Sequence, residues 1–547
     1  MSEIPEHIIN NMKNKRINVD LTTEILDNYN AGKYDHIDPV RVRDIPGIDG
    51  ESVVDMTADV SIRVHRESAD ARLGFVGNNC GAAEFAEADG DYLVFDRRGL
   101  EQLGRCLLPQ VAYGVLNGGS ATSYADYKKN AKFAPDLLEL VGEEFGRLAD
   151  ISRGRAKGIT PAFLQPDGTP GPSFLELKMR SLLIQALDYR LDFGGPPDTQ
   201  PHPAAPIFQM TSTYNTDDIA RSYDRYRASP MLADLIEATG IDITRVQTRV
   251  QPLLAAYTHS EAGRPKRIFA HAYGDEGETL PVPGGHGQNF QVLRDIYYWL
   301  YEQGKRFAYL GNVDNLGFTI DPVSVAYLAL SGKEAGFDFS FRTPVDVKGG
   351  ILVVDQHGRL NAADLGVAVS KDAVDAAEAD GKRILFNCAT GLFNLEYLVG
   401  ALDHIIENLP VRFSDQDKDA GRYSQAEQVT WEIIGMLDDF AVFGVDKYDR
   451  FLAAKLLLET LMTSGTRLDD GAYPSDEDTS KDLKRTARNL HTGLEHKLAT
   501  VYGMKRVGSR WVPKSVTELR KERGERGERG ERGERKERGE RAPGRDE

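Results

Sequence analysis

Hydrophobic residues in this chain form two alternating patterns, continuous runs and stripes with helical spacing. Continuous apolar runs predict buried strands over residues 111–116, 207–212, 306–312, 349–355 and 441–445. Apolar stripes predict helices over residues 174–191, 290–303 and 395–409. Strands and helices alternate from about residue 96 to about residue 415. This alternation predicts an α/β fold with a mixed, mostly parallel sheet, in which ligands bind beyond the carboxyl ends of the strands.

The pattern changes after residue 415. Ser424 and Glu427 have the spacing of a capping box, which predicts a helix over residues 428–440. A second helix is predicted over residues 451–462, and another follows the polar stretch 463–480. We therefore expect a short, mainly helical C-terminal region.

The length of 547 residues predicts more than one domain. Residues 1–95 show few clear patterns and form an N-terminal region, residues 96–425 form the core, and residues 426–519 form the C-terminal region. Residues 520–547 repeat the triplet GER. This segment lacks the prolines of a collagen triple helix, so we expect a disordered, solvated tail.

Composition limits the classes of partner. The net charge of −17 argues against a general nucleic-acid binder, although a locally basic cleft could still hold a small phosphorylated ligand. No apolar stretch has the length that a membrane span needs, and the N-terminus lacks a secretory signal pattern. Three widely separated cysteines suit neither a zinc site nor a disulfide framework. We expect a cytoplasmic protein, of unknown oligomeric state.

The most informative segment spans residues 111–132. Its predicted strand leads into Asn117, Gly118 and Gly119, and a group of lysines follows, namely Lys128, Lys129 and Lys132. Glycine allows close approach of a ligand to the backbone, and the peptide N–H groups of such a turn can hold an anion. Ammonium groups supply charge that suits phosphate. We interpret the segment as a triphosphate-binding loop, although an ordinary turn between strand and helix has a similar pattern.

A second polar cluster follows the predicted strand 306–312. It contains Asn312, Asp314 and Asn315. A carboxylate at the end of a strand can hold a divalent cation against phosphate oxygens, and the amides can bond to hydroxyl groups. A simple turn is the alternative interpretation.

Three more segments carry candidate side chains. His286 lies between Gly285 and Gly287 just before a predicted helix, where its imidazole could donate to a sugar or phosphate oxygen or could face solvent. Lys348 precedes two glycines and could reach a phosphate. Lys455 could do the same, or could lie along the surface as many lysines do.

These segments resemble, in the same order, the motifs of the eukaryotic-type UTP–glucose-1-phosphate uridylyltransferase family. "LNGG" with Thr122 and Ser123 resembles "LNGGLGTSMG", "PGGHGQ" resembles "PPGHGD", and "NVDNLG" resembles "NSDNLGA". "DVKGG" is shared, "FNCATGLFNL" resembles "FNTNNLWVNL", and "DRFLAAK" resembles "SRFLPVK". The resemblance extends over about residues 105 to 465 and implies a Rossmann-like nucleotidyltransferase core.

Several positions depart from the family pattern. Ala121 and Ala125 replace glycines, and Asn130 stands where the family has a lysine, which leaves Lys129 or Lys132 as its substitute. Ala389 and Thr390 replace the inner asparagines of "FNTNN". The chain also lacks the repeating strand pattern of the family's C-terminal β-helix, and its ending is similar to that of UDP-N-acetylhexosamine pyrophosphorylases.

The resemblance implies an enzyme that makes a UDP-sugar and pyrophosphate from UTP and a hexose 1-phosphate, with glucose 1-phosphate favoured and Mg²⁺ near Asp314. The implied nucleotide-binding residues are Leu116, Asn117, Gly118, Gly119, Thr122, Gln251 and Gly285. The implied sugar-phosphate residues are His286, Asn312, Asp314, Asn315, Lys348, Gly349 and Asn387, and the implied catalytic lysines are Lys129, Lys132 and Lys455. The alternatives are transfer to N-acetylglucosamine 1-phosphate and a catalytically silent protein that binds nucleotide sugars.

Overall fold

A computed structural model describes most of the chain. The described residues are 4–35, 40–79, 81–119, 124–194, 205–343, 346, 349–476 and 482–524. The predicted tail lies almost wholly outside them.

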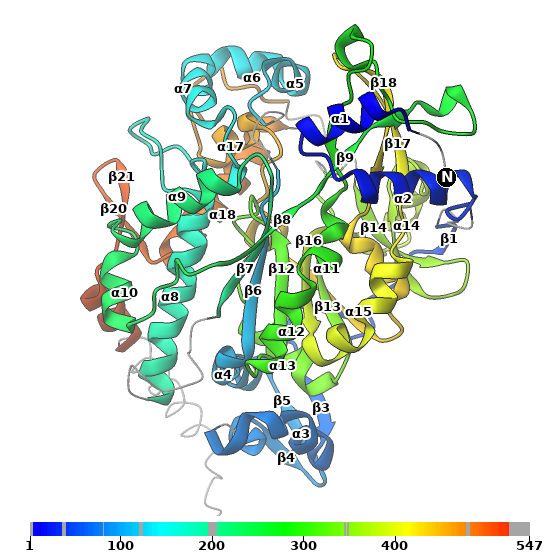
Figure 1. Ribbon diagram of the computed structural model, residues 1–547. Helices are drawn as coiled ribbons and strands as arrows, with labels where there is room; N and C mark the ends of the chain where they lie inside the picture. The colour runs from blue at the N-terminus through cyan, green and yellow to red at the C-terminus, as the bar shows by residue number, and fades with distance from the viewer. Residues whose placement is uncertain are drawn as a thin grey trace, which may run out of the picture.

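A mixed sheet of 11 strands runs through the molecule (Figure 1). Its main path has the order β2-β19-β13-β16-β12-β6-β7-β8, and β14, β15 and β1 extend it beside β16. Along the main path the strands span Val53–Asp55, Phe440–Val445, Ala335–Phe341, Leu385–Asn394, Phe307–Asn312, Val111–Leu116, Ile207–Ser212 and Gln247–Gln251. The extension consists of β14 (Gly350–Asp355), β15 (Leu360–Asp364) and β1 (Val42–Asp44).

Most neighbouring strands on the main path are parallel. Strand β16 is the exception, because it runs antiparallel to both β12 and β13. Strands β12 and β6 pair in parallel, with Asn312 opposite Leu116. The loops that follow these two strands therefore leave the sheet side by side. The predicted mixed, mostly parallel α/β fold is confirmed.

Alternate residues of the central strands face two different hydrophobic cores. Phe307 and Tyr309 of β12 pack into one core, and Ala308 and Leu310 pack into the other. The first core is covered by α3 (Arg66–Leu73), α4 (Arg97–Cys106), α8 (Phe174–Phe193), α13 (Pro322–Ser331) and α18 (Leu483–Thr500). The second is covered by α11 (Asn289–Val292), α12 (Arg294–Glu302) and α15 (Leu395–Asn408), which lie over the sheet in Figure 1. Burial on both faces explains why these strands appear in the sequence as continuous apolar runs.

Smaller units surround the sheet. One contains α5 (Tyr127–Phe133), α6 (Pro135–Leu140), α7 (Gly142–Ser152) and α17 (Leu457–Thr463). A second contains α1 (Glu6–Asn14), α2 (Val19–Asn30), β9 (Leu253–Ala255), β10 (Tyr257–Thr258), β11 (Pro281–Pro283), β17 (Arg412–Lys418) and β18 (Gly421–Glu427). The remaining elements are β3 (Ile62–His65), β4 (Glu87–Asp89), β5 (Tyr92–Phe95), α9 (Thr216–Arg227), α10 (Ala233–Thr239), α14 (Lys371–Ala379), α16 (Lys447–Arg450), β20 (Met504–Val507) and β21 (Arg510–Pro513).

The N-terminal region contributes to the central sheet. Strand β2 pairs with β19, and β1 pairs with β14. Residues before 95 are thus joined to the core by backbone hydrogen bonds. The boundaries of the four predicted parts stay a prediction.

Most predicted elements are confirmed, including β7, β12, β14, β19, α8 and α15. The predicted helix over 290–303 is divided at Leu293, and the one over 451–462 begins only at Leu457. The helix predicted over 428–440 is wrong. Ser424 is not a helix cap but lies in β18, where its hydroxyl contacts Lys266 and Asp415. Only a 3₁₀ helix, η8 (Thr430–Met436), follows.

The cysteines differ from the prediction in one respect. Cys388 is a free, buried thiol, whereas Cys106 is disulfide-bonded. The sequence predicted that the three cysteines do not suit a disulfide framework, and this prediction is wrong for Cys106. Among the helices of the described residues, none has the length and apolar character needed to cross a membrane.

Candidate functional site

The glycine loop begins where β6 ends. Asn117 is buried, its N–H donates to the carbonyl of Met210 at 2.9 Å, and its amide Nδ2 lies 3.2 Å from Gln209 Oε1. Asn215 donates from Nδ2 to the carbonyl of Gly118 at 3.2 Å. These bonds tie the start of the loop to β7 and to the residues that follow it. Thr122, also predicted to bind the nucleotide, lies outside the described residues.

Two other predicted nucleotide residues lie beside this loop. A Cβ atom added to Gly118 would come within 3.2 Å of Gln251 Oε1, so the end of β8 lies against the loop. Gln251 Nε2 donates to the carbonyl of Gly285 at 2.6 Å and to Gln288 Oε1 at 3.0 Å. Gly118, Gln251 and Gly285 come from distant parts of the sequence, and the fold brings them together as the prediction requires.

Gly285 needs to be glycine for two reasons. Its φ of 82° lies in the left-handed region, which side chains other than that of glycine rarely adopt. A Cβ atom at this position would also lie 2.3 Å from the carbonyl oxygen of Gln428. This tight contact fixes the position of the next residue, His286.

His286 is held by η8. Its Nδ1 accepts the backbone N–H of Thr430 at 3.1 Å and lies 2.8 Å from the hydroxyl oxygen of the same residue. Burial lowers the pKa of His286 to about 4. The imidazole is therefore neutral near pH 7, and because Nδ1 accepts, its proton lies on Nε2. The fold thus orients a donor at this position, rather than a freely solvated side chain.

The carboxylate of Asp314 is paired with Lys157, a residue that the sequence analysis did not single out. Lys157 Nζ lies 2.5 Å from Asp314 Oδ2, and the two side chains are only 12% and 16% exposed. The same ammonium donates to the carbonyl of Ala454 and lies 4.8 Å from the ring centroid of Tyr124. The backbone N–H of Lys157 donates to the carbonyl of Gly119 at 3.3 Å. Lys157 thereby joins the glycine loop, Asp314 and the segment that precedes Lys455.

The two asparagines beside Asp314 have different environments. Asn312 is the last residue of β12 and is partly exposed. Asn315 is buried, and its amide is used within the protein: Nδ2 donates to the carbonyl of Arg450 at 3.0 Å, and Oδ1 accepts the N–H of Gly317 at 2.9 Å. Asn315 therefore supports the turn, whereas Asn312 and Asp314 are the residues available to a ligand.

The predicted catalytic lysines lie on α5 and just before α17. Lys129 and Lys132 are exposed on α5. Asn130, which stands where the family has a lysine, is buried and accepts the N–H of Leu458 at 2.9 Å, so it connects α5 to α17. Lys455 is exposed directly after Ala454, the residue that Lys157 contacts.

The predicted sugar-phosphate segment is only partly described. Lys348 lies outside the described residues, while Gly349 has a φ of 145°. Asn387 Oδ1 accepts the backbone N–H of Ala389 at 2.7 Å, and Ala389 adopts a φ of 51°. This left-handed residue lies in β16 where its register with β13 shifts, next to the end of β12. Bulges of this kind often occur beside functional sites.

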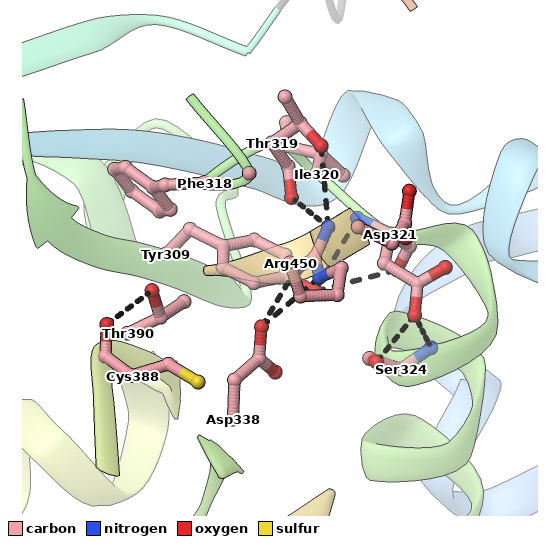
Figure 2. Close-up of polar contacts among 12 residues, drawn as sticks. Tyr309, Phe318, Thr319, Ile320, Asp321, Ser324, Asp338, Cys388, Thr390 and Arg450 are labelled. Carbon is pink, nitrogen blue, oxygen red and sulfur yellow. Dashed lines mark hydrogen bonds and ion pairs between the residues drawn. The ribbon is translucent and has the colours of Figure 1, made fainter. Parts of the chain in front are cut away.

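A sizeable cavity lies elsewhere in the described structure. It has a volume of about 520 Å³ and lies between α4, α8, α16, α18 and the segment Thr319–Pro322. None of the predicted site residues lines it. Arg450 lies at its wall, where it pairs with Asp338 at 2.8 Å and donates to the carbonyl of Thr319 (Figure 2). The cavity adjoins the back of the turn that carries Asp314.

Residues 266–478 match the family model described as UTP--glucose-1-phosphate uridylyltransferase. This is the family whose motifs the sequence resembles, and the match covers less than half of the chain. The family match includes His286, Asp314, Asn387 and Lys455, and it begins after the glycine loop and Gln251. The loop is connected to the matched part by the contacts of Gly285 and Lys157 described above.

Curated proteins with similar sequences have the same family name. A probable UTP--glucose-1-phosphate uridylyltransferase of Schizosaccharomyces pombe is 27% identical over 197 residues, which cover 36% of this chain and 33% of that protein. The UTP--glucose-1-phosphate uridylyltransferase of Musa acuminata is 24% identical over 335 residues, covering 60% of this chain and 64% of that protein. The matches thus span less than two thirds of these relatives. A solved structure of UDP-glucose phosphorylase from Trypanosoma brucei is 20% identical in sequence and has a TM-score of 0.45. The alignment covers 68% of this chain and 67% of that protein.

Proposed function

We propose that this protein transfers the uridylyl group of UTP to a hexose 1-phosphate, with glucose 1-phosphate as the favoured acceptor. The observation that carries the proposal is the position of Lys157, whose contacts join the glycine loop to Asp314 and to Ala454. Gln251 and Gly285 adjoin the same loop. These groups together provide backbone N–H donors, ammonium charge and a carboxylate, which suits a nucleoside triphosphate with a bound cation.

The reaction needs no nucleophile from the protein. A phosphate oxygen of the sugar 1-phosphate attacks the α-phosphorus of UTP. The bond from that phosphorus to the bridging oxygen of the β-phosphate breaks, and pyrophosphate leaves with the electron pair. Catalysis then depends on positioning of the two substrates and on neutralisation of negative charge.

In this proposal Lys157 takes the role that the family resemblance implied for Lys129 or Lys132. A lysine that serves the β- and γ-phosphates must lie at the glycine loop, and the backbone of Lys157 is bonded to Gly119. Lys455 directly follows Ala454, whose carbonyl Lys157 contacts, and supplies a second ammonium group. Asp314 and the carbonyl of Ala454 hold the Lys157 ammonium group in place.

Asp314 is the residue proposed to hold Mg²⁺. Mg²⁺ is commonly bound through one or two carboxylates and substrate phosphates, so a single carboxylate beside a phosphate loop fits this ion. The described residues contain no group of three or more histidine, cysteine, aspartate or glutamate side chains suited to a metal. When bound, Mg²⁺ would supply neutralisation of phosphate charge. The role of Lys157 would then be to hold phosphate oxygens, while Asn312 and His286 orient the sugar phosphate.

The test is a pyrophosphate-release assay with UTP, MgCl₂ and a panel of sugar 1-phosphates. The proposal expects turnover with glucose 1-phosphate, and turnover only with N-acetylglucosamine 1-phosphate would instead support that alternative. A silent binding protein would be stabilised against heat by a UDP-sugar and would release no pyrophosphate. ATP in place of UTP is the matched control, since it carries the same phosphates on a different base.

A further inference from the structure

Buried and half-buried side chains hold the turn that follows β12 and carries Asp314. Almost every backbone carbonyl from residue 315 to residue 320 accepts a hydrogen bond from one of them. Lys178 donates to the carbonyl of Asn315 at 2.7 Å, Tyr502 to that of Leu316 at 2.7 Å, and Tyr113 to that of Phe318 at 2.6 Å. Arg450 donates to the carbonyl of Thr319 at 3.0 Å, and Gln185 to that of Ile320 at 3.0 Å. We call these donors the carbonyl clamp, and Figure 2 shows the Arg450 part of it.

Lys178 is the least expected member of the clamp. It lies on α8, is 1% exposed, and donates to the carbonyls of both Asn315 and Phe318, at 2.7 and 3.1 Å. Within the described part of the chain, no carboxylate forms an ion pair with it. A buried ammonium group without a paired anion is costly, and an apolar side chain of similar length would avoid that cost. Burial accordingly lowers the pKa of Lys178 to about 7.

The position of Lys178 connects it to the proposed reaction. Its ammonium bonds to the carbonyl of the residue directly after Asp314, whereas Lys157 pairs with the Asp314 carboxylate itself. Helix α8 also packs against η4 (Lys157–Ile159), the 3₁₀ turn that carries Lys157. One helix therefore supports both partners of the Lys157–Asp314 pair.

We propose that Lys178 is a positioning residue of the nucleotidyl-transfer site. Its two carbonyl bonds fix the direction in which the turn presents Asp314, and in its protonated form its charge balances the carboxylate. This inference rests on the proposed function. The inference goes beyond the proposed function because it assigns a role to a buried residue that touches neither substrate.

The chain offers a matched control at the other end of β12. Lys305 is also buried, at 6% exposure, and its Nζ donates to the carbonyl of Pro109 at 2.6 Å. Burial lowers the pKa of Lys305 to about 8. It thus shares the burial and bonding of Lys178 but lies before β12, away from Asp314.

The experiment compares Lys178→Met and Lys305→Met in the full-length protein. We expect both to change the melting temperature by similar amounts. Only Lys178→Met should lower kcat, by tenfold or more, and raise the Mg²⁺ concentration needed for half-maximal rate by at least fivefold. Lys178→Arg, which can still donate to both carbonyls, should recover most of the kcat. Should Lys178→Met not fold, Lys178→Gln serves in its place, since it keeps donor atoms and loses the charge.

Each result is decisive. The inference is overturned if the wild type is active and Lys178→Met has a kcat and a Mg²⁺ dependence within twofold of those of Lys305→Met. That result leaves the proposed function intact. Equal losses in both variants would overturn it too, because they would reflect general damage to the core. A wild type that releases no pyrophosphate with any sugar 1-phosphate refutes the proposed function, and this inference falls with it.

Discussion

Lys157 is the residue on which the proposed reaction depends most, and Lys157→Met tests it directly. Methionine keeps the length of the side chain and removes the charge. The substitution leaves Asp314, which is 16% exposed, without its ion-pair partner. Breaking a fully buried pair costs about 3–5 kcal/mol, and the residual exposure here reduces the expected loss of stability to about 2–3 kcal/mol.

The effect on catalysis should be larger than the effect on folding. Removing one preorganised donor to developing charge typically raises the barrier by about 3–4 kcal/mol, which is a loss of roughly 10²–10³ in kcat. The assay is steady-state pyrophosphate release at saturating UTP and sugar 1-phosphate, together with urea unfolding. Lys129→Met and Lys132→Met are matched controls on α5, and we expect both to keep kcat within about threefold of wild type.

A second variant separates the two effects. Asp314→Asn removes the other charge of the pair. The double variant Lys157→Met with Asp314→Asn should therefore regain part of the stability that Lys157→Met loses. Its turnover should stay low, because the phosphate contact is still missing. If Lys157→Met keeps half of the wild-type kcat, Lys157 does not have the proposed role. A loss of activity in Lys129→Met or Lys132→Met, with Lys157→Met still active, would assign that role to the α5 lysine instead.

Three further predictions concern single residues of the same site. Lys455→Met should lower kcat by roughly a hundredfold with little change in melting temperature, since the side chain is exposed, and wild-type turnover would remove it from the mechanism. Gly285→Ala should destabilise the protein by more than about 1 kcal/mol, because the left-handed φ of 82° and the contact with Gln428 both oppose a Cβ atom, and an unchanged urea midpoint would contradict this. His286 has a folded-state pKa of about 4 against 6.5 when unfolded, so its contribution to stability is complete above pH 6.5 and is lost as the pH falls towards 4, by at most about 3 kcal/mol. Urea unfolding between pH 7.5 and 4.5 should show a steeper loss for wild type than for His286→Gln, and parallel curves would refute the assignment.

Local patterns were sufficient for much of the fold. The strands β6 and β12 are buried on both faces, so their apolar runs and the glycine or aspartate that follows soon after could be found in the sequence alone. The capping-box prediction at Ser424 was wrong because a local signal competed with strand pairing. Residues of β18 bond along their length to β17, and this pairing outweighs the short helical pattern that follows.

The sequence by itself determined which strands end in ligand-binding turns and which residue types stand there. Tertiary structure alone decided which of those side chains face a ligand. Asn130 and Asn315 have the same chemistry as Asn312, but they are buried and bonded within the protein. Lys157 is separated from the glycine loop in sequence by the helices α5, α6 and α7, and Lys178 lies on a helix whose pattern gives no sign of a functional lysine. Their roles follow only from the parallel pairing of β6 with β12, which brings the ends of distant strands together whatever the length of chain between them.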